Sequence, residues 1–274
     1  MAETYVGVSG WRYPRWRGDF YPAGLVQRRE LEYVAERMTS VELNGSFYSL
    51  QRPSTYRRIA EQVPPGFPVA VKGGGFVTHM KRLRDVDQGL ANFVASGVLA
   101  LGDRLGPFLW QLPADLAFDA DVVGGFLERL PRDHAGLAEL AGRHDDKLAA
   151  DRVVTEPLVD APVRHALEPR HPSFGDPAAV RLLRDHGVAL VDSDSPGSWP
   201  RFDEATADFR YVRLHGHTEL YASGYAAASL DGWAGRLRGW SAAGQDGYVY
   251  FDNDARGRAP FDAVALLRRL GKAG

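Results

Sequence analysis

The sequence predicts an α/β fold and, within that class, a single (β/α)8 TIM-like barrel. Three observations favour this fold. The chain has 274 residues, close to the usual length of one such barrel. Eight short β-rich runs recur along it, and most of them are followed by a segment of helical periodicity. Because strand and helix alternate, parallel strands with right-handed crossovers are expected. An open doubly wound sheet is the alternative fold. It is disfavoured because no glycine-rich phosphate loop follows the first β-rich run.

The predicted strands are rich in β-branched and aromatic residues and end at turn residues. They are 5–8, 40–43, 69–72, 108–111, 164–168, 188–191, 211–214 and 248–251. Apolar spacing and capping residues predict helices at 31–38, 54–63, 90–101, 121–130, 176–187, 229–240 and 261–270. Residues 195–208 are rich in proline and glycine and carry no helical pattern, so one covering helix is expected to be missing or short. Residues 141–161 are predicted to be a surface insertion within one domain, 1–274.

The composition is that of an ordinary globular protein. The formal net charge is -2 at pH 7, 45% of residues are hydrophobic and 25% are charged, so any anion-binding surface must be local. The absence of cysteine excludes disulfides, thiolate metal sites and a cysteine nucleophile. No apolar stretch at the start is long enough for a signal or a span, so a cytoplasmic protein with no membrane partner is expected.

Candidate functional residues follow from the barrel prediction, because active groups of such barrels sit where the strands end. The candidate catalytic residues are Glu42, Glu168, Asp192 and His215. The candidate substrate-binding residues are Trp11, Asn44, Tyr48, Lys72, His79, Gln111, Arg170, Arg213 and Asn253. The alternative for any one of them is a buried ion pair that only closes the barrel, such as Arg213 with Glu168 or Asp192.

The segment 11–21 interleaves aromatic residues with Arg12, Arg15 and Arg17. Aromatic faces stack on bases and guanidinium groups pair with phosphate, which would suit a nucleotide or nucleic acid. A packed lid with solvated arginines fits the same residues equally well. Both interpretations stay open at the level of sequence.

Three further patterns were weighed for chemistry. His215 and His217 could hold a divalent metal, but two histidines at this spacing are a weak signal, so no metal ligand is assigned and the cofactor is left unknown. A retaining glycosidase is disfavoured because Gln111 and Arg213 stand where strands four and seven end. The triplet 73–75 of glycines suits either a phosphate contact or a permissive turn.

Taken together, motifs from the first strand to the last resemble the family of unknown function called DUF72, or YecE-like. They are Ser9-Gly10-Trp11, Phe20-Tyr21-Pro22, Val41-Glu42-Leu43-Asn44, Phe47-Tyr48, Thr78-His79, Gln111-Leu112-Pro113, Glu168-Pro169-Arg170-His171-Pro172-Ser173, Asp192-Ser193-Asp194, Arg213-Leu214-His215-Gly216 and Phe251-Asp252-Asn253. The resemblance implies a TIM-barrel-like fold and no established activity. Similarity in shape to the endonuclease IV and xylose isomerase barrels suggests a DNA-backbone role by fold analogy alone. Gly45, Asp252 and His217 depart from the family pattern.

The residues favour an enzyme, hydrolytic or lyase-like, acting on a phosphorylated or sugar-phosphate substrate at the carboxyl rim. Glu42 or Glu168 would be the general acid or base, His215 a proton shuttle or metal ligand, and Lys72, Arg170 and Arg213 anion clamps. A non-catalytic nucleic-acid or nucleotide-binding protein is the alternative, and a scaffold protein is the third class.

Overall fold

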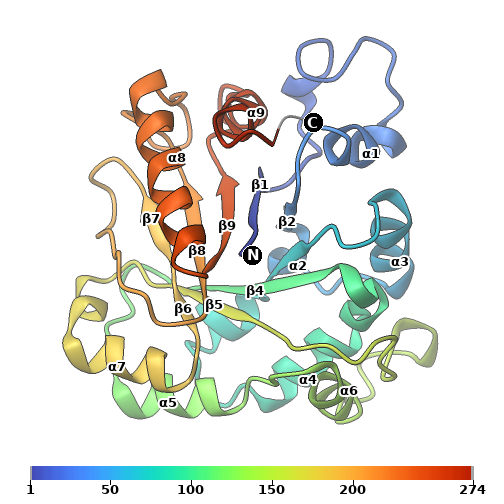
Figure 1. Cartoon of the computed structure of the whole chain (residues 1–274). Coiled ribbons are helices and arrows are strands. Elements are labelled where there is room, and N and C mark those ends of the chain that lie inside the picture. Colours follow the sequence, from blue (N-terminus) through green and yellow to red (C-terminus); the bar gives the residue numbers. More distant parts are fainter. Residues whose placement is uncertain (1, 273–274) are drawn as a thin grey trace.

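The computed structural model describes residues 2–272, so the outermost ends of the predicted domain lie outside the described residues. Every strand pair in it is parallel, and Figure 1 shows the strands in the middle with helices around them. The strands are β1 (Thr4–Val8), β2 (Val41–Leu43), β3 (Val69–Lys72), β4 (Leu105–Gln111), β5 (His165–Glu168), β6 (Ala189–Leu190), β7 (Asp192–Asp194), β8 (Phe209–Leu214) and β9 (Asp246–Phe251). The predicted α/β fold with parallel strands is confirmed.

The strands form two sheets where the sequence predicts one ring. One sheet has the order β1-β9-β8-β7 and the other β2-β3-β4-β5-β6. The sixth predicted strand, 188–191, contains β6, which pairs with β5. A further strand, β7, begins directly after Val191 and pairs with β8. At the other junction, β1 and β2 are linked by a single parallel bridge between Ser9 and Glu42.

The helices are α1 (Glu30–Ala35), α2 (Gly45–Tyr48), α3 (Pro53–Gln62), α4 (Asp87–Ala95), α5 (Ala120–Glu128), α6 (His134–Ala141), α7 (Pro177–Asp185), α8 (Ala227–Ala242) and α9 (Ala259–Arg269). The helix predicted over 90–101 ends early, because Gly97 adopts a φ of 122° and a short 3-10 segment, Val98–Arg104, follows it. Asp176 caps α7 by accepting a hydrogen bond from the Ala178 amide, as predicted. Residues 195–208 contain no helix, also as predicted.

Side chains of both sheets meet in one buried apolar cluster. Its members are Ala70, Leu109, Ala166, Ala189, Val191, Phe209, Tyr211, Tyr248 and Tyr250, while a larger cluster packs the helices against the outside of the strands. The contact between β1 and the segment before β2 requires a glycine, since a Cβ on Gly7 would lie 1.9 Å from the Ser40 carbonyl oxygen. No helix of the described residues is long and apolar enough to cross a membrane.

Candidate active site

Arg213, on β8, is the centre of a buried charge network at the carboxyl ends of the strands. Its guanidinium donates to Glu42 at the end of β2 (2.8 and 3.2 Å) and to Glu168 at the end of β5 (3.0 Å). It also donates to Ser9 Oγ (2.9 Å) and to Asp252 just after β9 (3.1 Å). Four strands thus direct polar groups at one fully buried cation, which forms ion pairs with three carboxylates.

The Glu42 and Glu168 carboxylates are both engaged by hydrogen bonds and ion pairs within the network. Burial would raise the pKa of Glu168, but the charges of Arg213 and then Arg170 hold it well below its ordinary value. Glu42 accepts from Ser9 and Arg213 on one oxygen and from Tyr211 (2.6 Å) and Arg213 on the other. Neither side chain is exposed. Both carboxylates therefore belong to the buried charge network around Arg213.

His215 also belongs to this buried charge network. Its Nε2 lies 3.1 Å from Glu168 Oε1, and its Nδ1 lies 3.1 Å from Asp252 Oδ2 without the alignment of a hydrogen bond. His217 is exposed, because β8 ends at Leu214 and Gly216 turns the chain with a φ of 126°. The two imidazoles therefore do not converge. Within residues 2–272, no group of three or more His, Asp or Glu side chains could hold a metal ion.

A cavity of about 520 Å³ lies at the strand ends beside this network. It takes polar side chains from several loops and strands, so it mixes cations, carboxylates and aromatic rings. Its lining residues are Tyr13, Asn44, Phe47, Tyr48, Lys72, His79, Gln111, Arg170, Tyr221, Asp252, Asp254 and Ala255.

Lys72, the last residue of β3, supplies a buried amine to the cavity. Burial, and then the charge of Arg213, lowers its pKa to about 8. Its Nζ lies 4.6 Å from the centroid of the Phe47 ring, and among the described residues it forms no ion pair within 4.0 Å. An amine with this pKa exists in both protonation states near neutral pH, so it can bind an anion or accept a proton.

Arg170 supplies the second cation. Its guanidinium carbon lies 3.7 Å from the centre of the Trp199 ring, and its Nη2 lies 3.7 Å from Glu168 Oε1. Its Nε is buried and has no hydrogen-bond partner among the described residues. The ring fixes the plane of the guanidinium, and the side chain lines the cavity.

Asp254 is a carboxyl group of the cavity wall with a strongly raised pKa. Burial, and then the neighbouring Asp252 charge, raises its pKa to about 8. Trp16 Nε1 donates to its Oδ1 (3.1 Å), while its Oδ2 is buried without a partner in the described chain. At neutral pH this carboxyl group is mostly protonated and can donate a proton at the cavity wall.

The raised pKa of Asp254 predicts a pH-dependent effect of Asp254→Asn. The unfolded carboxyl ionises near pH 4 while the folded one keeps its proton to about pH 8, so the wild-type protein loses stability across that window. The amide cannot ionise, so the variant should gain about 5 kcal/mol relative to wild type between pH 4 and pH 9, because about four pKa units correspond to about 1.4 kcal/mol each. Urea unfolding at a series of pH values measures this gain. A stability difference that does not change with pH would show that the carboxyl titrates normally.

The structure sorts the predicted site residues into three groups. Asn44, Tyr48, Lys72, His79, Gln111 and Arg170 line the cavity. Glu42, Glu168, Arg213 and His215 form the buried network below it. Trp11, Asp192 and Asn253 lie elsewhere.

Each of these three residues is placed by a specific contact. Asp192 accepts hydrogen bonds from Arg201 (2.7 Å) and Arg236 (2.8 Å). The next residue of β7, Ser193, donates to Glu168 instead, because successive side chains of a strand point to opposite faces. Asn253 is fully buried and donates to Ser223 and Asp262. Trp11 lines a neighbouring cavity of about 350 Å³, which shares Tyr13 and Asn44 with the 520 Å³ cavity. We leave all three out of the site.

Sequence reasoning placed Asp252 among the polar strand-end residues but did not assign Tyr13, Phe47, Tyr221 or Asp254 to the site. Asp254 could have been found, since it alternates with Asp252 immediately after a predicted strand. Tyr221 could not, because it lies in a loop after β8 and reaches the cavity through a φ of 60°, which is unusual for a residue other than glycine. Such strained positions are common at functional sites.

The aromatic segment 11–21 is a packed layer. Trp16 contacts Tyr13, Phe20 and Tyr21 with ring centroids 5.0–5.6 Å apart, and Trp16 and Tyr21 are almost fully buried. Arg17 pairs with the buried Glu30. These rings are not free to stack on bases. The glycine triplet is also explained by packing, because a Cβ on Gly73 would lie 2.2 Å from Trp110 Cε3.

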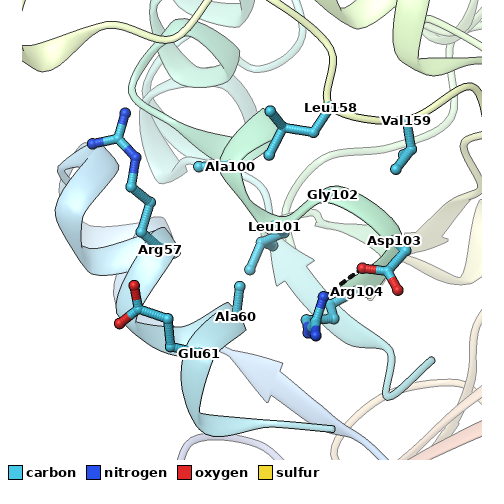
Figure 2. Close-up of a pocket in the computed structure, with 10 residues that line it drawn as sticks. All are labelled: Arg57, Ala60, Glu61, Ala100, Leu101, Gly102, Asp103, Arg104, Leu158 and Val159. Carbon is cyan, nitrogen blue, oxygen red and sulfur yellow. Dashed lines mark hydrogen bonds and ion pairs between the residues drawn. The ribbon is translucent and has the colours of Figure 1, made fainter. Parts of the chain in front are cut away.

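A third cavity, of about 340 Å³, lies between α3 and the 98–104 segment, away from the predicted site residues; we call it the control cavity (Figure 2). Arg57 and Glu61 of α3 and the apolar Leu158 face it, and Arg104 pairs with the adjacent Asp103. None of its lining residues lines the 520 Å³ cavity. Substitutions at this cavity are therefore suitable controls for substitutions in the 520 Å³ cavity.

The fold and the site define an α/β protein of parallel strands with a charged cavity at their carboxyl ends. The chain belongs to the family described as "Protein of unknown function DUF72", whose model matches residues 5–274. The resemblance seen in the sequence motifs is thereby confirmed.

Individual relatives agree with this assignment. The chain is 29% identical to the Escherichia coli K12 protein "UPF0759 protein YecE" over 110 residues, which are 40% of this chain and 38% of YecE. The match thus spans well under half of that relative. A crystal structure of a DUF72 family protein from Thermotoga maritima is 25% identical, with a TM-score of 0.76 over 98% of this chain and 99% of the other. One from Enterococcus faecalis is 14% identical, with a TM-score of 0.74 over 98% and 95%.

Proposed function

We propose that the protein is an enzyme that binds a small phosphorylated ligand, such as a sugar phosphate, in the 520 Å³ cavity and transfers protons there in a hydrolytic or lyase-like reaction. One observation carries the proposal. Two cations, Lys72 and Arg170, line one cavity, and Lys72 forms no ion pair within the described residues. An anion in the cavity would supply the counter-charge that Lys72 lacks.

The site is proposed to stand at the rim of one closed eight-stranded barrel formed by a single domain. β6 and β7 would be two halves of one strand, since only Val191 separates them. The bridge between Ser9 and Glu42 would close the ring on the other side. The apolar cluster shared by both sheets supports this arrangement, because strands of a small barrel fill its interior with side chains.

The proposed roles differ from the sequence-based hypothesis. Asp254, whose pKa is raised to about 8, is the acid, and Lys72 in its ammonium form binds the anion. Arg170 clamps the anion. Glu42 and Glu168 hold Arg213 in place, and both are fully buried, so they are positioning residues rather than proton carriers.

A nucleic-acid platform is supported less well. Its aromatic rings would have to be exposed for stacking, whereas Trp16, Phe20 and Tyr21 bury one another. The cavity at the strand ends, of about 520 Å³, also has the volume of a small-ligand site.

Calorimetric titration with inorganic phosphate at pH 7 tests the proposal. We expect the wild-type protein to bind phosphate and Arg170→Met to bind it about 10-fold more weakly, because a charge-assisted hydrogen bond is lost. Arg57→Met, which removes an exposed arginine at the control cavity (Figure 2), is the matched control and should bind as wild type does. Absence of phosphate binding, or equal loss in both variants, would contradict the proposal.

A further inference from the structure

An apolar cavity of about 660 Å³ adjoins the polar cavity. Phe47, Tyr48, Phe76 and Met80 line it, and Phe93 lies among its lining residues as well. Phe47 and Tyr48 also line the polar cavity, so the two spaces share one wall. A ligand held by Lys72 and Arg170 can therefore extend into the apolar space.

The exposed apolar side chains of the protein concentrate at this place. Of the seven large hydrophobic side chains exposed within the described residues, Tyr48, Leu50, Phe76 and Met80 all line this cavity. Tyr48 is 82% exposed and Met80 75%. Scattered exposed side chains need no explanation, but a patch beside a polar cavity marks a binding surface.

One turn of π-helix, Phe76–Met80, joins the two cavities. It places His79 in the polar cavity and Phe76 and Met80 in the apolar one. The turn begins after the glycine triplet, and a Cβ on Gly75 would lie 3.0 Å from the Phe47 ring. Single π-turns are rare and occur often at functional sites.

The backbone after this turn is strained, which indicates that its position is fixed by its surroundings. Arg82, Leu83 and Asp85 have φ values of 50°, 66° and 49°, and Leu83 is buried. Such conformations cost free energy and persist only where the structure enforces them. The wall formed by Phe76 and Met80 is thus preformed.

We propose that the natural ligand has two parts: an anionic head bound by Lys72 and Arg170, and an aromatic group seated against Phe47, Tyr48, Phe76 and Met80. The ligand class is an aryl phosphate or a closely related aromatic anion. The inference rests on the proposed function, because it takes the polar cavity as the anion site. An aromatic group fits because aromatic rings and a methionine thioether pack favourably on a ring.

The test compares inorganic phosphate, 1-naphthyl phosphate and neutral 1-naphthol by calorimetry. We expect naphthyl phosphate to bind at least about 10-fold more tightly than inorganic phosphate, because the ring buries apolar surface. Phe76→Ala should weaken naphthyl phosphate about 5-fold and leave inorganic phosphate within about 2-fold. Leu158→Ala removes a 65% exposed apolar side chain at the control cavity and should change neither affinity.

The outcomes separate this inference from the proposed function. If inorganic phosphate binds but the naphthyl group adds nothing, or Phe76→Ala has no selective effect, the two-part ligand is wrong and the anion site stands. If naphthol binds as tightly as naphthyl phosphate, the head group is irrelevant and the inference fails. If neither phosphate binds, both proposals are overturned.

Discussion

Arg213→Met is expected to destabilise the protein by about 3–5 kcal/mol, the range for removing one partner of a buried ion pair. The methionine nearly matches the volume of the lost side chain, so the cost is electrostatic. Without the guanidinium, the carboxylates of Glu42, Glu168 and Asp252 remain buried at the strand ends with no central cation. The free energy of unfolding in urea at pH 7 measures the loss.

Two further variants separate this electrostatic cause from a packing defect. Adding Glu42→Gln and Glu168→Gln to Arg213→Met should recover part of the lost stability, since two uncompensated charges disappear. Arg57→Met should leave the stability within about 0.5 kcal/mol of wild type, because that side chain is exposed. A single Arg213→Met variant as stable as wild type would show that the network does not hold the strand ends together.

Lys72→Met is expected to weaken phosphate binding by about 30-fold or more at pH 7. The ε-ammonium is buried in the cavity, where a charge interacts more strongly than at the surface. The variant should at the same time be as stable as wild type or slightly more stable, because a buried cation held without an ion-pair partner is replaced by an apolar side chain. Calorimetry with phosphate and urea unfolding together measure both effects.

A second lysine provides the comparison for Lys72. Lys272 pairs with Glu3 at 2.6 Å and lines neither the 520 Å³ nor the 660 Å³ cavity, so Lys272→Met should not change phosphate affinity. If both lysine variants bind phosphate as wild type does, the anion is held somewhere other than in this cavity.

Much of the fold could be predicted because the spacing of apolar residues along the chain indicates which side of each strand or helix is buried. The alternation of strand and helix gives parallel strands, and the Asp176 cap marks the start of α7. The further strand β7 after Val191 was not predictable, because it depends on pairing with β8 rather than on the residues themselves. Helices α2 and α6 were missed as well, since four and eight residues are too few to show a clear period.

Six of the predicted site residues line the cavity, because strand ends of parallel sheets gather at one rim. The roles were harder to predict than the positions. Glu42 and Glu168 have the residue type of a general acid or base, but only the structure shows that Arg213 occupies both. Tyr221 and Asp254 come from loops, whose path no local pattern determines.

The titration of Lys72 tests the central claim most directly. Its side chain can be followed by NMR in lysine-labelled protein, with Lys72→Met assigning the signal among the four lysines of the chain. The account predicts a pKa near 8 in the free protein and a rise when inorganic phosphate is added, because a bound anion stabilises the ammonium. A pKa near 10.5 that phosphate does not change would contradict an anion site at Lys72.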